Sequence, residues 1–135
     1  MTLGNQDISD FGILVYTFDR LSRIQVVDSI RRAFPGVDVV LPLPDEVKEL
    51  RVPTRCYDLL IVGPSHSLDR IEHLLEKVRL RCPDTPVIWV GRSFSERALE
   101  MAKKMEIEAT LSLTQLHLLG EKIRELLLDA ELTDC

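Results

Sequence analysis

Hydroxyl, imidazole and guanidinium groups gather in four short stretches that each follow a predicted strand. These stretches are Thr17–Asp19 (TFD), Gly63–Ser67 (GPSHS), Gly91–Ser93 (GRS) and Leu113–Gln115 (LTQ). An arginine with nearby serines can bind an anion over the start of a helix, where free backbone N–H groups point outward. Ser65, Arg92 and Ser93 are therefore candidate contacts for an anionic ligand.

Ser65 beside His66 offers part of a hydrolase site, but the sequence does not complete it. The stretch GPSHS lacks the GxSxG pattern that holds a nucleophilic serine at a strand-to-helix turn. No nucleophile, base and acid can be assembled from the sequence, so we expect no enzyme activity. Nucleotide-binding glycine motifs and clusters of cysteine and histidine are also absent, so we expect no cofactor and no metal.

Five apolar runs alternate with helical patterns along the chain, and these elements must position the four stretches. The expected strands are Phe11–Phe18, Val37–Pro44, Tyr57–Val62, Val87–Gly91 and Glu108–Leu113. The expected helices are Arg20–Phe34, a brief one at Asp45–Leu50, one between Ser67 and Cys82, Phe94–Met105 and Gln115–Leu132. Strictly alternating strands and helices predict a five-stranded parallel sheet with helices on both faces, a (βα)5 flavodoxin-like fold. Residues 11–130 are expected to form this domain, with polar tails at 1–10 and 131–135.

Polar residues at the helix starts predict the caps. Asp19 is placed to cap the first helix, and Ser65 or Ser67 the third. Ser93 with Glu96 has the spacing of a capping box, and Thr114 can cap the last helix.

Apolar residues at helical spacing predict which helix faces are buried. On the first helix the predicted stripe is Leu21, Ile24, Val27, Ile30 and Phe34. On the third it is Leu68, Ile71, Leu74, Leu75 and Val78, and on the last it is Leu116, Leu119, Ile123, Leu126 and Leu127. Leu118, Leu128 and Leu132 fall off the last stripe. They indicate either an exposed apolar surface for a partner or a wide buried face.

Charge, hydropathy and cysteine content limit the partners and the compartment that we expect for the protein. The net charge of −5 argues mildly against nucleic acid as the main partner, which requires a basic face. No apolar run is long enough to cross a membrane. Cys56, Cys82 and Cys135 are odd in number and widely spaced, so we expect reduced thiols and a cytoplasmic protein, with Cys135 exposed.

Three stretches, YDLLIVG, CPDTPVIWVG and SERALEMAKKMEIEATLSL, together resemble the receiver domains of bacterial response regulators. The resemblance covers roughly residues 11–130 and is most specific in PDTPVIWVG. In receivers, acidic residues after the first strand hold Mg²⁺, and an aspartate ending the third strand accepts a phosphoryl group. A Ser or Thr after the fourth strand and a Lys after the fifth bind the phosphoryl oxygens.

None of these chemical groups is found at the matching positions of this chain. The acidic pair falls on Thr17 and Phe18, the phosphoacceptor on Gly63, the Ser or Thr on Gly91, and the Lys on Leu113. The resemblance therefore implies an atypical receiver, or pseudo-receiver, that works without phosphorylation. Asp19 is either an acidic remnant or a helix cap, and Phe18 is placed to fill the metal's space. A phosphoacceptor with a displaced aspartate is the contrary hypothesis.

Receivers commonly bind partners or themselves through the fourth helix, fifth strand and fifth helix, so the resemblance implies the same face here. The candidate contacts on that face are Arg97, Lys104, Leu116, Leu118, Arg124 and Leu128. Arg20, Arg23, Arg31 and Arg32 make the first helix basic, which indicates either an acidic partner or a solvated face. The expected function is regulation by protein contact, including a homodimer, in bacterial signalling or transcription. Nucleic acid would be bound only by a separate domain if this chain is a fragment, and the alternative function is a small-ligand sensor.

Overall fold

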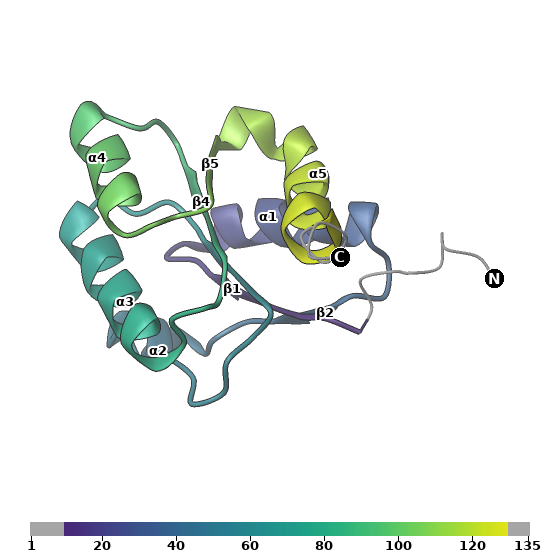
Figure 1. The fold of residues 1–135 in the computed structure, drawn as a ribbon, viewed down its shortest axis with the longest axis horizontal. Coiled ribbons are helices and arrows are strands. Elements are labelled where there is room, and N and C mark those ends of the chain that lie inside the picture. The colour runs from purple at the N-terminus through teal and green to yellow at the C-terminus, as the bar shows by residue number, and fades with distance from the viewer. Residues whose placement is uncertain (1–9, 130–135) are drawn as a thin grey trace.

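The computed structural model describes residues 10–129, and its strands and helices alternate in the expected order (Figure 1). The strands are β1 (Gly12–Tyr16), β2 (Asp38–Val40), β3 (Leu59–Val62), β4 (Val87–Gly91) and β5 (Ala109–Ser112). The helices are α1 (Arg20–Ala33), α2 (Pro44–Lys48), α3 (Leu68–Arg81), α4 (Glu96–Lys104) and α5 (Leu119–Arg124). A 3₁₀ segment, η2 (Leu113–Leu118), precedes α5, and a π-helical segment, η3 (Glu125–Asp129), follows it. None of the helices within residues 10–129 is long and apolar enough to cross a membrane.

The five strands form one sheet in the order β2-β1-β3-β4-β5, and every neighbouring pair is parallel. The side chains of β1, β3 and β4 are buried on both faces, as their continuous apolar runs predict. The chain leaves β1 toward one edge of the sheet and returns to β3 on the other side of β1. This switch point brings the carboxyl ends of β1 and β3 together, where ligands bind in such folds.

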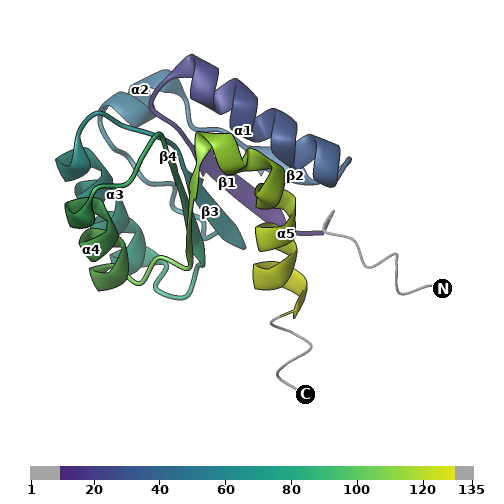
Figure 2. The same ribbon diagram turned by 90° about the horizontal axis from the view of Figure 1, so that it is seen from above.

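Helices cover the sheet in two layers, with α1 and α5 on one face and α2, α3 and α4 on the other (Figures 1 and 2). The strands supply alternate side chains to the two cores. Ile13, Ile61 and Ile88 belong to the core under α1 and α5, while Leu14, Leu60 and Trp89 belong to the core under α3 and α4. The predicted fold class is therefore confirmed.

The first helix buries only part of the predicted stripe. Its buried residues are Ser22, Val26 and Ile30, whereas Leu21 and Ile24 are exposed. Asp19 caps the helix as predicted, accepting a hydrogen bond from the Ser22 backbone N–H at 2.7 Å. The Ser22 hydroxyl donates to the second Asp19 carboxylate oxygen at 2.9 Å. The Ser22 side chain can therefore be buried without leaving its hydroxyl unsatisfied. Ile30 and Phe34 of the predicted stripe are buried and Val27 packs against the core, so the apolar spacing was correct for the later part of the helix and wrong for its first turns.

Two further caps differ from the sequence prediction. Ser67 caps α3, in agreement with one of the two predicted choices. However, α4 is capped by Ser95, whose hydroxyl accepts from the Ala98 N–H at 3.1 Å, and not by Ser93. Thr114 does not cap the last helix, because η2 starts one residue earlier, with Ser112 at its N-cap. The Ser112 N–H donates to the Gln115 side chain at 3.0 Å.

The last predicted helix is divided into three parts. The 3₁₀ segment η2 contains a kink at Gln115, α5 follows it, and the helix widens into η3. Leu119, Ile123 and Leu127 are buried, and the partly buried Leu116, Leu118, Leu126 and Leu128 pack against the same core. The wide buried face, one of the two alternatives, is therefore what the structure contains. Leu132 lies outside the described residues.

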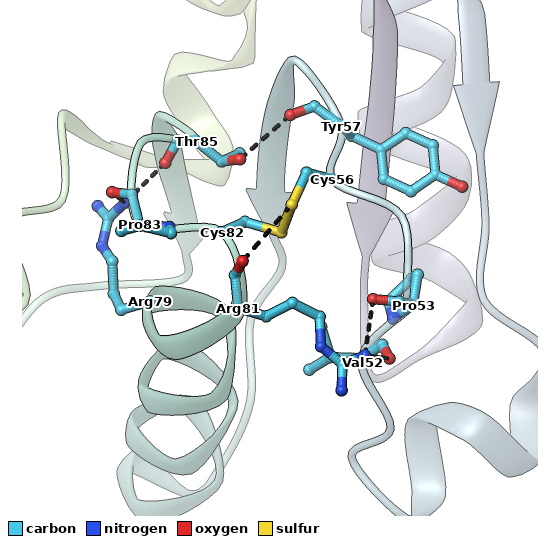
Figure 3. Close-up of a disulfide and its surroundings, with 9 residues drawn as sticks. All are labelled: Val52, Pro53, Cys56, Tyr57, Arg79, Arg81, Cys82, Pro83 and Thr85. Atoms are coloured by element: carbon cyan, nitrogen blue, oxygen red, sulfur yellow. Dashed lines mark hydrogen bonds between the residues drawn. A yellow bond between two sulfur atoms is a disulfide. The ribbon is translucent and has the colours of Figure 1, made fainter.

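A disulfide joins Cys56, in the segment before β3, to Cys82 at the end of α3 (Figure 3). The expectation of reduced thiols is therefore wrong for these two cysteines, while Cys135 lies outside the described residues. Hydrogen bonds tie the same two segments together. The Arg81 guanidinium donates to the Val52 and Pro53 carbonyls at 3.3 and 3.2 Å. With these thiols paired, cysteine content no longer argues for a reducing compartment.

Candidate functional site

Thr17 and Gly63 lie side by side at the carboxyl edge of the sheet, where a receiver would carry its acidic residues. Tyr16 pairs with Val62, and the Gly63 N–H donates to the Tyr16 carbonyl at 2.8 Å. A Cβ atom added to Gly63 would lie 2.6 Å from Cγ2 of the buried Thr17, closer than two carbons can approach. The Thr17 methyl group therefore fills the space that an aspartate at position 63 would need.

Gly91 is covered in a similar way by an aromatic side chain. A Cβ atom on Gly91 would lie 3.0 Å from Cζ of Phe94. Phe94 packs edge-on against Trp89 of β4, with ring centroids 5.0 Å apart. The sequence analysis assigned no role to Phe94, because it is predicted to start a helix.

Leu113 replaces the lysine at the end of the fifth strand with an apolar side chain. It is partly buried and packs against the core under α1 and α5. No cation is therefore supplied from this position to the edge of the sheet.

Phe18 forms a wall between two hollows at the switch point. One hollow, of about 290 Å³, lies toward α1, and the other, of about 430 Å³, lies toward α3. The Arg70 guanidinium lies over the Phe18 ring at 5.3 Å and donates to the Val47 carbonyl at 3.0 Å. Arg70 was not singled out from the sequence, and its contact with Phe18 depends on how α3 packs beside β1.

Asp19 is the sole carboxylate among the described residues that line these two hollows. Its oxygens accept hydrogen bonds from the Ser22 N–H and hydroxyl, and Arg92 lies 3.6 Å away. Magnesium prefers several oxygen ligands in octahedral geometry, and a receiver supplies carboxylates for it. Thr17 and Phe18 do not provide them, so the residues present do not fit the Mg²⁺ site of a receiver. No group of three or more His, Cys, Asp or Glu side chains within residues 10–129 is arranged to hold a metal ion.

Ser65, Arg92 and Ser93 line one further hollow of about 270 Å³ between β3 and α4. The structure therefore brings together all three of the predicted anion contacts. His66 lines the same hollow, but it makes no hydrogen bond to Ser65 within the described part of the chain. The Ser65 hydroxyl instead accepts from the Ser67 N–H at 3.1 Å.

Tyr16 is a fully buried polar residue beneath this site that the sequence analysis did not single out. Its hydroxyl lies 3.0 Å from the Glu46 carbonyl and 2.9 Å from the Arg51 carbonyl, so it ties the α2 region to β1. Burial raises the pKa of Tyr16 from 10.0 to about 12, although the positive charge of Arg70 opposes this change.

The predicted interaction residues lie on both sides of the edge strand β5. Arg97 and Lys104 of α4 are exposed and approach α3, at 4.0 Å from Asp69 and 3.5 Å from Glu72. Arg124 of α5 lies over the ring of Phe34, 5.4 Å from its centroid. Leu116, Leu118 and Leu128 are only partly exposed. The more exposed apolar side chain is Leu99 of α4, which the sequence analysis did not name.

Comparison with known proteins identifies the fold. No protein-family model and no curated protein matches the sequence. Solved structures match it along most of its length. The CheY-like receiver domain protein of Methanospirillum hungatei is 17% identical, with a TM-score of 0.71, over 93% of this chain and 98% of that one.

Two other similar structures are described as response regulators. The LuxR-family DNA-binding response regulator of Staphylococcus aureus is 13% identical, with a TM-score of 0.71, over 86% of this chain and 98% of that one. The orphan response regulator HP1043 of H. pylori is 12% identical, with a TM-score of 0.67, over 88% and 98%. The chain therefore has the fold of response-regulator receivers, as the sequence resemblance implied.

Proposed function

We propose that this chain is a phosphorylation-independent, receiver-like domain that regulates bacterial signalling by protein contact. The observation that carries the proposal is the packing of Thr17 against Gly63, which replaces the acidic pocket of a receiver with close apolar contact. Leu113 and Phe94 extend the same replacement to the ends of β5 and β4. With no carboxylate to accept a phosphoryl group at this position, a change of partner or of concentration must supply the signal.

The contact surface in this proposal is the face formed by α4, β5 and α5. It carries the exposed Leu99 of α4, of which 48% is accessible to solvent, whereas Arg97 and Lys104 of the same helix approach α3. The partner is another protein or a second copy of the chain. If the chain is part of a longer protein, the output, including any binding of DNA, would come from a separate domain. The domain itself would have no enzyme activity. A cytoplasmic setting would be supported by the likeness to receivers and not by the cysteines, two of which form a disulfide.

Self-association of purified protein tests this surface. Sedimentation velocity over a micromolar concentration series should show a dimer that Leu99→Ser disrupts, and acetyl phosphate with Mg²⁺ should not change it. Leu80→Ser is a matched control, because Leu80 is 87% exposed on α3, away from this face. A dimer lost equally in both variants would contradict the assignment of the face.

A protein that stays monomeric would exclude the homodimer, and capture from a native lysate then tests the partner. A protein retained by the native chain and by Leu80→Ser, but lost with Leu99→Ser, supports the proposal. Retention by all three chains would contradict it. Leu118 and Leu128 are unsuitable for this test because they pack against the core.

A second candidate function, sensing a small anionic ligand, is favoured by the hollow that Ser65, Arg92 and Ser93 share. Thermal unfolding with inorganic phosphate, nucleotides and phosphorylated metabolites tests it. A bound ligand would raise the melting temperature in proportion to the logarithm of its concentration above the Kd. Arg92→Ala should abolish that rise, and an unchanged melting temperature across the panel would contradict the candidate.

A further inference from the structure

Helix α1 presents apolar side chains to solvent. Leu21 is 66% exposed and Ile24 is 52% exposed. Just after β2, Leu41 and Leu43 are also exposed, at 38% and 66%. Single exposed apolar residues are ordinary on protein surfaces, but Ile24 and Leu41, from two adjoining segments, line the same hollow and indicate a contact surface.

Two hollows of about 290 and 300 Å³ adjoin each other along this boundary, and Arg23 and Leu41 line both of them. We call the two together the α1–β2 groove. Its apolar lining includes Ile24, Val27, Leu41, Pro42 and Pro44. The groove lies at the β2 edge of the sheet, whereas the α4–β5–α5 face lies at the opposite edge.

Arginines outnumber acidic residues in the lining of the α1–β2 groove. Arg20, Arg23 and Arg31 line it, and none of them forms an ion pair with any residue between 10 and 129. Its two acidic residues are already engaged. Asp28 pairs with Arg32 at 3.0 Å, and Asp19 caps the helix and approaches Arg92. A chain with a net charge of −5 therefore carries a local surplus of positive charge here.

We propose that the α1–β2 groove binds an acidic, amphipathic segment of a partner protein. Apolar side chains of the segment would cover Ile24, Val27 and Leu41, and its carboxylates would pair with the three arginines. Bidentate pairing of guanidinium and carboxylate groups supplies direction to such a contact. A nucleic acid would satisfy the arginines but not the apolar lining, so the combination of both features favours a peptide.

The test uses a designed helical peptide with leucines along one face and glutamates along the other. Two companion peptides replace the glutamates by lysines or the leucines by serines. The full chain should bind the Glu/Leu peptide at least about tenfold more tightly than either companion, as read by fluorescence anisotropy. Backbone amide shifts in NMR spectra should locate the peptide on α1 and on the segment after β2.

Matched variants test whether binding of the peptide depends on the residues of the α1–β2 groove. The double variant Arg23→Glu/Arg31→Glu should weaken binding about tenfold or more, because attraction becomes repulsion at two points. Arg97→Glu/Lys104→Glu changes the net charge equally on the other face and should leave binding unchanged. Ile24→Ser should also weaken binding, while Leu80→Ser should not. Thermal unfolding of each variant confirms that it remains folded.

Several results would overturn the proposal. These are no binding of the Glu/Leu peptide, equal binding of the Lys/Leu peptide, or an equal loss in the control variants. Amide shifts confined to other surfaces would also exclude the groove. A concentration-dependent dimer that Ile24→Ser disrupts would show that a second copy of this chain, and not an acidic partner segment, covers the groove.

Discussion

The methyl group of Thr17 occupies the space that any side chain at position 63 would require. The approach is 2.6 Å between Thr17 Cγ2 and the position of a Cβ atom on Gly63, and it follows from the pairing of β1 with β3. In a receiver these two positions would carry acidic side chains that face a metal ion. Here the Thr17 side chain packs against Gly63, so an aspartate at position 63 would collide with it.

Gly63→Ala should destabilise the protein by about 1–3 kcal/mol, because the new methyl group overpacks a buried contact. Thr17→Ser removes Cγ2 and keeps the hydroxyl, so it should relieve part of that cost. The two substitutions should therefore be coupled by about 1 kcal/mol in a double-mutant cycle measured by urea unfolding.

Thr85→Ser provides the matched control for this cycle. It also removes a methyl group from a buried threonine, and a serine there can keep the hydrogen bond to the Tyr57 carbonyl. The change in the free energy of unfolding that Thr85→Ser causes should add to the change caused by Gly63→Ala. Coupling as large as that of Thr17→Ser would show that the effect does not arise from the contact between Thr17 and Gly63.

Stability should fall as the pH rises from about 10 to about 12. In the unfolded chain Tyr16 loses its proton near its usual pKa, whereas burial raises the folded pKa to about 12. Between these values the unfolded state binds fewer protons, so the free energy of unfolding decreases, by at most roughly 2–3 kcal/mol.

Tyr16→Phe should remove this decrease in the free energy of unfolding between about pH 10 and 12, as measured by urea unfolding across that range. Tyr57→Phe serves as the control and should retain the loss. An identical decrease in stability at alkaline pH in the native protein and in Tyr16→Phe would contradict the assignment of this decrease to Tyr16.

Breaking the disulfide should destabilise the protein by about 3 kcal/mol, because Cys56 and Cys82 close a loop of 26 residues. The measurement is unfolding with and without a thiol reductant. In the variant Cys56→Ser/Cys82→Ser the reductant should have no effect. Equal stability of the native protein in both conditions would be at odds with a disulfide in the folded chain.

Asp19→Ala should cost about 1 kcal/mol, because α1 loses the side chain that accepts from Ser22 N–H. Asp19→Asn should cost less, since an amide oxygen can also cap a helix. Added Mg²⁺ should not stabilise the native protein in thermal unfolding. Stabilisation by Mg²⁺ that disappears in Asp19→Asn would instead make Asp19 a remnant metal ligand.

The sequence was sufficient to predict the five-stranded parallel sheet. A short, continuous apolar run such as Leu59–Val62 indicates a strand buried on both faces, and the alternation of such runs with helices predicts a parallel arrangement. Gly63 and Gly91 could be assigned to strand ends because each follows such a run directly. The assignment of Ser65, Arg92 and Ser93 to one site followed from the same rule about strand ends.

The sequence was insufficient where burial or contact depends on a specific partner residue, which the pattern of apolar residues does not reveal. The Ser22 hydroxyl reaches Asp19 and its side chain is buried, so hydrophobicity did not indicate which residues in the first turns of α1 pack inward. The pairing of Cys56 with Cys82 depends on where α3 ends relative to β3. The contact of Thr17 with Gly63 depends on the register between β1 and β3, which a single sequence does not specify.

Phosphoryl transfer from acetyl phosphate in the presence of Mg²⁺ tests the central claim most directly. Intact mass spectrometry of the native chain, beside a receiver that retains its aspartate, provides the measurement. We predict that the control protein gains the mass of a phosphoryl group and that this chain keeps its original mass. A stoichiometric adduct on this chain would show that it carries a displaced phosphoacceptor, and it would contradict regulation independent of phosphorylation.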